Sequence, residues 1–331
     1  MPGAKQVENH RKSKKTEGLR RELAHVQLVL DERAQFLRAQ RHRLRALLGE
    51  KVGKLRRLRR LEPAALGEWL GGRPVAGVDG SCNSVGAAYP HYITLLVAAA
   101  RCTTGQETWV YRVWSPLTSG EARGQEADDM ARRHALSVLE AQVAEEALTR
   151  FQPRLLLVDG PLVRLRIEAQ EEWEALFRRA RAQQVILVGV IESVGTSLLA
   201  PLLGEVLPPT WADAHDRELL WGLLEPGEML TVAHPHKPGL RSCFLRPSLD
   251  PAPVGLDFPA LAPWPGTDIE TVADVLYTLT PEKGRGIPVW VDLVDSLVRL
   301  DDRLVEALVA GGISRENWLR FFAPKRARRP F

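Results

Sequence analysis

Two short apolar segments of this chain end in the same dipeptide, aspartate followed by glycine. They read VAGVDG at residues 75–80 and LLLVDG at residues 155–160. A carboxylate at the end of a buried strand is costly unless something at that position requires negative charge. A glycine after it allows a sharp turn and lets a phosphate group approach the backbone. One such pair is usually only a turn, so the motif is informative if the fold brings Asp79 and Asp159 together.

Two further acids could join this pair. Glu140 lies in a helical pattern over residues 128–151, and a step of about 100° per residue places it in the middle of the apolar face. An acid on a buried helix face requires a cation or another partner. Asp295 lies at the edge of a valine stripe in the helix predicted over residues 289–312, where a solvated aspartate is an equally good interpretation.

A crevice lined by these four carboxylates would offer only oxygen ligands. Such a site suits Mn²⁺ or Mg²⁺ and not zinc. Two ions about 4 Å apart could activate a water molecule and stabilise the leaving oxygen during phosphodiester cleavage. The residues predicted to ligate the two ions and to act in catalysis are Asp79, Glu140, Asp159 and Asp295.

The charge distribution predicts where phosphates would bind. Residues 1–60 hold 18 Lys and Arg against 6 Asp and Glu, whereas the remainder holds 27 against 35. A basic arm beside an acidic body suits a protein that binds nucleic acid with the arm and metal with the body. Alternatively, basic termini merely keep the chain in solution. The residues predicted to contact DNA are Gly80, Ser81, Gly160, Lys12, Lys14 and Lys15.

The elements that must position the acids form an α/β pattern. Strands are predicted over residues 74–80, 91–101, 107–114, 154–160 and 185–192, with helices over 128–151 and 167–184. A hairpin followed by two βαβ units gives a mixed five-stranded sheet flanked by helices, with the spatial order 3-2-1-4-5. In that order the first and fourth strands are parallel neighbours. Their tips, which carry Asp79 and Asp159, then face one crevice.

The rest of the chain is predicted to surround this sheet. We expect a disordered basic tail over residues 1–16, a helical arm over 17–70, an α/β domain over 71–312 and a basic tail over 313–331. The segment at about 200–281 is proline-rich and weakly periodic, which suggests short strands and loops, and we expect it to form an insertion or a flank to the sheet. No apolar run is long enough to span a bilayer, and no secretory signal is evident. Three scattered cysteines favour a cytoplasmic location.

Several motifs resemble those of the NurA nuclease family, whose members work with the hexameric ATPase HerA and have a ribonuclease H-like fold. The resemblance is carried mainly by VAGVDGS (75–81), VLEAQVAEEAL (138–148), LLLVDGPL (155–162) and GIPVWVDLVDSL (286–297). It implies that Asp79, Glu140 and Asp159 ligate metal. The chain departs from the family pattern twice, with Glu192 where a lysine is common and Asp295 where a histidine is common.

The resemblance also implies a biological role. It implies a manganese-dependent 5′-to-3′ exonuclease with single-strand endonuclease activity, acting on single- and double-stranded DNA during end resection for recombination repair. It further implies a homodimer that docks onto HerA. The amphipathic arm and the C-terminal NWLRFFAPKRARR are candidates for these contacts. Intramolecular packing of Trp318, Phe321 and Phe322 is the alternative.

Two other functions compete with a nuclease. The altered residues at 192 and 295 are compatible with a non-catalytic clamp that binds DNA and regulates a helicase. A phosphotransferase or ATPase would require a glycine-rich phosphate loop after the first strand, but DGSCNSVGAAYP has no such pattern.

Overall fold

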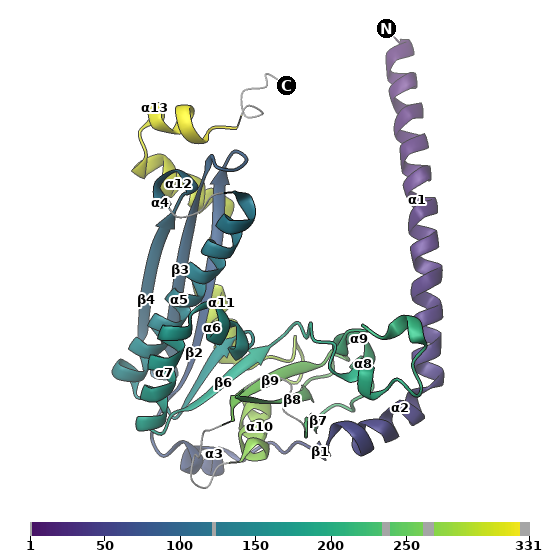
Figure 1. The fold of residues 1–331 in the computed structure, drawn as a ribbon, viewed down its shortest axis with the longest axis vertical. Coiled ribbons are helices and arrows are strands. Elements are labelled where there is room, and N and C mark those ends of the chain that lie inside the picture. The colour runs from purple at the N-terminus through teal and green to yellow at the C-terminus, as the bar shows by residue number, and fades with distance from the viewer. Residues whose placement is uncertain (1, 121–123, 234–238, 261–267, 325–331) are drawn as a thin grey trace.

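A mixed α/β fold is built around one large sheet (Figure 1). The computed structural model describes residues 2–120, 124–233, 239–260 and 268–324, with side chains from residue 16 onward. The strands are β1 (Leu55–Arg57), β2 (Val75–Gly86), β3 (Tyr92–Cys102), β4 (Glu107–Trp114), β5 (Leu155–Asp159), β6 (Ile186–Ile191), β7 (Glu228–Thr231), β8 (Leu240–Arg246) and β9 (Val254–Pro259).

Helices flank this sheet and extend the chain at its N-terminal end. The α-helices are α1 (Pro2–Ala39), α2 (Arg41–Leu47), α3 (Pro63–Leu70), α4 (Pro116–Ser119), α5 (Gln125–Phe151), α6 (Leu162–Glu168), α7 (Gln170–Ala182), α8 (Leu199–Leu202), α9 (Asp216–Leu220), α10 (Ile269–Thr278), α11 (Val289–Val298), α12 (Asp302–Gly312) and α13 (Arg315–Asn317). Short π-helical segments are η1 (Leu48–Val52) and η3 (Trp318–Phe322), and η2 (Pro209–Trp211) is a 3₁₀ turn.

The sheet has nine strands in the described part of the chain, so the prediction of five was wrong. Its order is β1-β7-β8-β9-β6-β5-β2-β3-β4. The five predicted strands are neighbours in the predicted order, from β4 through β3, β2 and β5 to β6. The segment at 200–281, expected to be an insertion, supplies β7, β8 and β9, and the arm supplies β1. Of these additions, β9 pairs with the edge of β6, whose backbone groups would otherwise lack partners, and β8, β7 and β1 follow in turn.

Strand β2 is longer than its apolar part. It pairs in parallel with β5 as far as Val78 and Val158, then continues with β3 alone until Gly86 pairs with Tyr92. Residues 81–86 are therefore strand and not the turn that the sequence predicted. The polar stretch forms a strand because the long β3 offers it backbone partners along its whole length.

The two faces of the sheet are covered by different helices. Helices α5, α6 and α7 pack on one face, against Ala76 and Val78, whereas α10 and α11 pack on the other, against Val75 and Leu155. Side chains alternate along a strand, so even-numbered residues of β2 face α5 and odd-numbered ones face α11. Gly77 allows α11 to approach closely, because a Cβ there would lie 2.4 Å from the backbone oxygen of Trp290.

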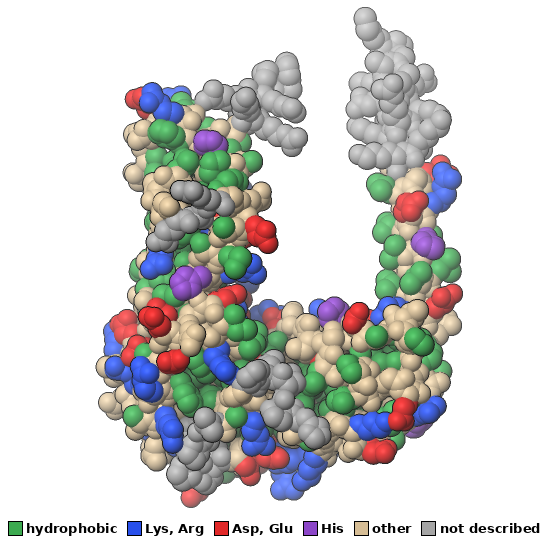
Figure 2. Space-filling model, viewed as in Figure 1, with side chains coloured by type: hydrophobic (Ala, Val, Ile, Leu, Met, Phe, Trp, Pro, Cys, Tyr) green, Lys and Arg blue, Asp and Glu red, His purple; other side chains and the backbone are tan. Residues whose placement is uncertain are grey.

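The arm departs from the long helix that the sequence predicted. Helix α1 begins at Pro2 and includes residues for which we expected disorder, and the arm then divides into α2, η1 and β1. The helix is first interrupted at Gln40, and the helical part ends at Gly53, where a Cβ would lie only 1.8 Å from the backbone oxygen of Thr231. Figure 1 shows α1 standing apart from the sheet, and Figure 2 shows hydrophobic side chains along its described part.

The last predicted helix is also divided. Helix α11 ends at Val298, and Asp301 begins α12 by accepting a hydrogen bond from the Leu304 N–H at 2.7 Å. Beyond α12, Phe322 is buried against Ile93 and Val309, which supports intramolecular packing of this aromatic side chain. The basic residues 325–331 lie outside the described residues. No helix among those described is long and apolar enough to cross a membrane.

Candidate metal centre

Asp79 and Asp159 occupy equivalent positions on two parallel neighbours. Val78 pairs with Val158, and each aspartate is the next residue of its strand. Alternation along the strands directs both side chains toward the face covered by α11. The geometric prediction made from the two Asp-Gly motifs is therefore met by the fold.

Asp79 is a buried acid with which no cation of the described residues pairs. Asp79 is 8% exposed. Among the described residues, its side chain accepts one hydrogen bond, from the Gly80 N–H at 2.7 Å. Burial, together with the negative charges of Asp159 and Glu140, raises the pKa of Asp79 to about 8. A carboxyl group in such surroundings favours either a proton or a bound cation.

Asp159 shares this environment. Burial raises its pKa, and the negative charges of Asp295 and Glu192 raise it further, while Arg164 and the Gly160 N–H act in the opposite direction. Gly160 has φ +85°, a conformation that favours glycine. The predicted sharp turn after the second aspartate is thus confirmed.

Glu140 reaches the same place from the opposite face of the sheet. It is 2% exposed on α5, as its position on the apolar face predicted. Gly80 makes room for it, because a Cβ at residue 80 would lie 2.7 Å from the Glu140 Oε1 and 2.8 Å from its Cγ. The first glycine therefore does not turn the chain. It removes the side chain that would separate Glu140 from the strand carrying Asp79.

Asp79, Glu140 and Asp159 are the inner acids, and among the described residues the cation that pairs with one of them is Arg164. It donates from Nη2 to Oε2 of Glu140 in a short ion pair and to the backbone oxygen of Asp159 at 3.3 Å. Its Nη1 donates to the Ser137 Oγ at 3.0 Å. The sequence analysis did not identify Arg164, although it did indicate that a buried Glu140 would require a cation.

Asp295 belongs to a more exposed group of acids around a second arginine. The Arg285 guanidinium pairs with Glu192 at 2.9 Å, with Asp292, and with Asp295 at 3.7 Å. Arg299 also pairs with Asp295, at 3.0 Å. Nothing in the sequence around Arg285 indicated this role, because it lies in a glycine-containing segment without periodicity.

The donor set suits a hard divalent cation. Within the part of the chain that the structure describes, no three His, Cys, Asp or Glu side chains are arranged as a ready-made metal site. Arg164 pairs with one oxygen of Glu140, and Arg285 and Arg299 both pair with Asp295. Burial and the negative charges of neighbouring acids raise the pKa of Asp79 and of Asp159, and a bound cation would relieve both effects. Carboxylate oxygens are the ligands that Mg²⁺ and Mn²⁺ prefer.

The predicted DNA contacts are placed differently. Gly80 lies inside β2 against Glu140, and Ser81 pairs with Val97 within the sheet, so neither forms a turn that could cradle phosphate. Gly160 alone retains that possibility. The side chains of Lys12, Lys14 and Lys15 lie outside the described residues.

Comparison with known families supplies the assignment. Residues 73–300, more than half of the chain, match the NurA domain. The chain belongs to the NurA family. The match spans β2 to α11 and so includes the strands and helices that carry the acids of this NurA protein. None of the curated proteins matches its sequence.

Solved structures show only weak similarity to this NurA protein. The catalytic domain of human endonuclease V has 13% identity and a TM-score of 0.37, with 82% of this chain and 96% of that chain covered. Endonuclease V of Ciona intestinalis in complex with an inosine-containing 23mer DNA has 13% identity and a TM-score of 0.39, with 84% and 99% covered. RuvC of T. thermophilus in complex with a Holliday junction substrate has 17% identity and a TM-score of 0.16, with 43% and 87% covered. These scores are too low to assign an activity.

The two departures from the NurA pattern lie side by side in the structure. Glu192 and Asp295, where the resemblance led us to expect a lysine and a histidine, both contact Arg285. We call Glu192, Arg285, Asp292 and Asp295 the rim. The positive charge at this rim therefore comes from Arg285, which lies on another segment than residues 192 and 295.

Proposed function

We propose that this protein is a metal-dependent deoxyribonuclease. The observation that carries the proposal is the position of Asp79 and Asp159 on adjacent parallel strands, with Glu140 reaching them past Gly80. Membership of the NurA family supports hydrolysis of nucleic acid, and the order of the five central strands is the one that a ribonuclease H-like fold implies.

The inner acids would hold Mn²⁺ or Mg²⁺, in our proposal as two ions, with Asp295 completing the set. When bound, such ions would activate water and stabilise the leaving oxygen of a phosphodiester. The chain itself contributes the arrangement and the burial of the carboxylates. Because the pKa of Asp79 lies at about 8, this residue must lose a proton before it can act as a ligand near neutral pH.

The substrates in this proposal are single- and double-stranded DNA. We propose 5′-to-3′ exonuclease activity with single-strand endonuclease activity during end resection for recombination repair, supported by NurA membership. The basic residues before Gly18 would contact the DNA backbone. Deleting residues 1–16 should weaken DNA binding and flatten its dependence on salt, because fewer counterions are then released. Unchanged binding across salt concentrations would show that this segment is inert.

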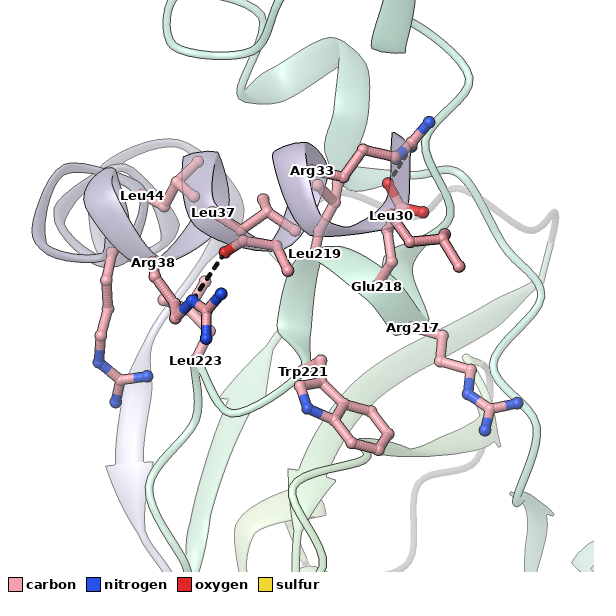
Figure 3. Close-up of a pocket in the computed structure, with 12 residues that line it drawn as sticks. Leu30, Arg33, Leu37, Arg38, Leu44, Arg217, Glu218, Leu219, Trp221 and Leu223 are labelled. Carbon is pink, nitrogen blue, oxygen red and sulfur yellow. Dashed lines mark hydrogen bonds and ion pairs between the residues drawn. The ribbon is translucent and has the colours of Figure 1, made fainter. Parts of the chain in front are cut away.

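Two protein partners belong to the same proposal, a second copy of the chain and HerA. Helix α1 supports them, because Leu19, Leu23, Val26 and Leu30 are each at least half exposed. The base of the helix is anchored by Arg33, which pairs with Glu218. A groove of about 480 Å³ lies between this part of the helix and the 217–223 segment. Figure 3 shows the leucine, tryptophan and arginine side chains that line it. A cytoplasmic location, expected from the cysteine pattern, completes the proposal.

The test is digestion of single-stranded and duplex DNA with Mn²⁺, comparing the wild type with Asp79→Asn. Asp128→Asn is the matched control, because Asp128 is also a buried acid but bonds to Trp114 and Tyr92, away from the acids described above. We expect cleavage by the wild type and the control and none by Asp79→Asn. DNA that is bound but not cut by the wild type, with and without HerA, would favour the non-catalytic clamp.

A further inference from the structure

We propose that Arg164 is a positioning residue that holds Glu140 with one carboxylate oxygen turned toward the cation site. This inference rests on the proposed function, because it concerns how the chain prepares a ligand for a divalent ion. It goes beyond naming Asp79, Glu140 and Asp159 as ligands. That set alone does not explain how Glu140, on the face of the sheet covered by α5, is directed toward a cation held by the aspartates on the other face.

The guanidinium is fixed by three partners on two segments, α5 and the end of β5. Arg164 projects from α6, and its contacts are the Glu140 carboxylate on α5, the Ser137 Oγ on α5 and the backbone oxygen of Asp159 at the end of β5. Ser137 is itself oriented, since its hydroxyl donates to the Glu168 Oε2 at 2.6 Å. The side chain of Arg164 is 26% exposed. A planar guanidinium held in this way has little freedom to turn.

The two oxygens of Glu140 therefore have different surroundings. Oε2 is taken by Arg164, whereas Oε1 lies over Gly80, 2.7 Å from the position that a Cβ would occupy. No hydrogen bond to Oε1 is present among the described residues. Oε1 is thus the oxygen that faces the strand carrying Asp79 and remains free for a cation.

Burial makes this arrangement necessary. The Glu140 side chain is 3% exposed, and a buried carboxylate without a partner is strongly unfavourable. Without Arg164 the glutamate would turn toward whatever donor or water it could reach. With Arg164 in place, the direction of the carboxylate is set before any cation arrives, which is the usual role of a partner behind a metal ligand.

A double-mutant cycle distinguishes this role from a purely structural ion pair. Mn²⁺ binding would be measured by isothermal titration calorimetry for the wild type, Arg164→Gln, Glu140→Gln and the double variant. We expect Arg164→Gln to weaken Mn²⁺ binding by about 10- to 100-fold. The double variant should bind no more weakly than Glu140→Gln alone, because Arg164 acts through Glu140.

A matched control is available on α5. Arg132 is 23% exposed and pairs with the fully buried Asp128, so Arg132→Gln also removes an arginine from a buried acid, away from the carboxylates that would hold metal. It should leave Mn²⁺ affinity unchanged within about twofold. Should Arg164→Gln fail to fold, Ser137→Ala provides the second test, because it removes one support of the guanidinium and keeps its charge. That variant should weaken Mn²⁺ binding several-fold.

The outcomes separate the two proposals. If the wild type binds Mn²⁺ and Arg164→Gln binds it with equal affinity, the positioning role is overturned and the proposed function is not. The same holds for Ser137→Ala if Arg164→Gln does not fold. A double variant that binds markedly more weakly than Glu140→Gln overturns it as well, because Arg164 would then act independently of Glu140. A wild type that binds no Mn²⁺ and cuts no DNA overturns the proposed function and this inference with it.

Discussion

The two Asp-Gly pairs are identical as dipeptides, but their glycines do different work. Gly160 has φ +85° and turns the chain at the end of β5, with Arg164 as its nearest neighbour, 3.7 Å from an added Cβ. Gly80 continues the strand, and the space that it leaves is filled by Glu140. The same dipeptide therefore meets a requirement of backbone conformation at Gly160 and a requirement of side-chain packing at Gly80. Both arrangements place an aspartate at the same level of two neighbouring strands, one residue beyond the Val78–Val158 pair.

The largest effects are expected at the aspartates themselves. Asp159→Asn should abolish cleavage while folding and DNA affinity stay nearly intact, since it removes a charge and keeps the shape. The loss should exceed about 100-fold, because partners behind a ligand already account for 10- to 100-fold. Cleavage rates, DNA binding and the melting temperature would be measured together. An unfolded Asp159→Asn variant would show that this aspartate is structural.

The pH dependence tests whether Asp79 is the acid that must be deprotonated. Below pH 8, Mn²⁺ affinity should rise by about tenfold per pH unit, because one proton is displaced on binding, and it should level off above pH 8. Calorimetric titrations at several pH values would show this slope. In Asp79→Asn the remaining binding should lose most of the slope, and a slope unchanged by this substitution would assign the proton elsewhere.

Stability of the metal-free protein should change in the opposite direction with pH. The pKa of Asp79 is higher in the folded chain than in the unfolded one, so the folded state binds the proton more tightly. This contribution to stability is complete below the unfolded pKa and is lost as pH rises through about 8. The melting temperature in EDTA should therefore fall from pH 6 to pH 9, and fall less in Asp79→Asn. An equal fall of the melting temperature in the wild type and in Asp79→Asn would show that the proton on Asp79 does not cause it.

Alanine substitutions at the two glycines sharpen the comparison directly. Gly80→Ala should lower Mn²⁺ affinity by about tenfold or more, because the methyl group displaces the Glu140 carboxylate. Gly160→Ala should instead lower the free energy of unfolding by about 1–2 kcal/mol, through the left-handed backbone, with little change in Mn²⁺ affinity. Calorimetry and chemical denaturation would separate the two effects. Equal effects on metal binding would remove the distinction between the glycines.

The smallest effects are expected at the rim. Glu192 and Arg285 have side chains that are 37% and 49% exposed, and exposed ion pairs contribute roughly 0–1 kcal/mol. Glu192→Gln should therefore change the free energy of unfolding by less than about 1 kcal/mol. It should change Mn²⁺ affinity by less than about threefold. A loss as large as that of Asp159→Asn would make Glu192 a ligand in its own right.

The sequence predicted the central elements because their apolar patterns are strong and local. The apolar runs that end at Asp79 and Asp159 are the buried parts of β2 and β5. The helical wheel placed Glu140 on the buried face for the same reason. The neighbour relation followed from the preferred handedness of βαβ connections.

The remaining features depend on contacts between distant segments. Residues 81–86 are polar, and only the length of β3 makes them a strand. Short strands are expected within residues 231–266, but that they extend the central sheet is evident only from the pairing of β9 with β6 and of β8 with β9. Arg164 and Arg285 are two of many arginines in the sequence, and only the folded chain distinguishes them from the others. The division of the last predicted helix at Arg299 was likewise not evident, since no glycine or proline marks it.

The most direct test is a crystal structure of the protein grown or soaked with Mn²⁺, with the ion located from its anomalous scattering. The account predicts a peak coordinated by Asp79, Asp159 and the Oε1 of Glu140, with Arg164 still bound to the other oxygen of that glutamate. A peak elsewhere, or Mn²⁺ held by the rim acids alone while Asp79 stays protonated and unligated, would contradict it.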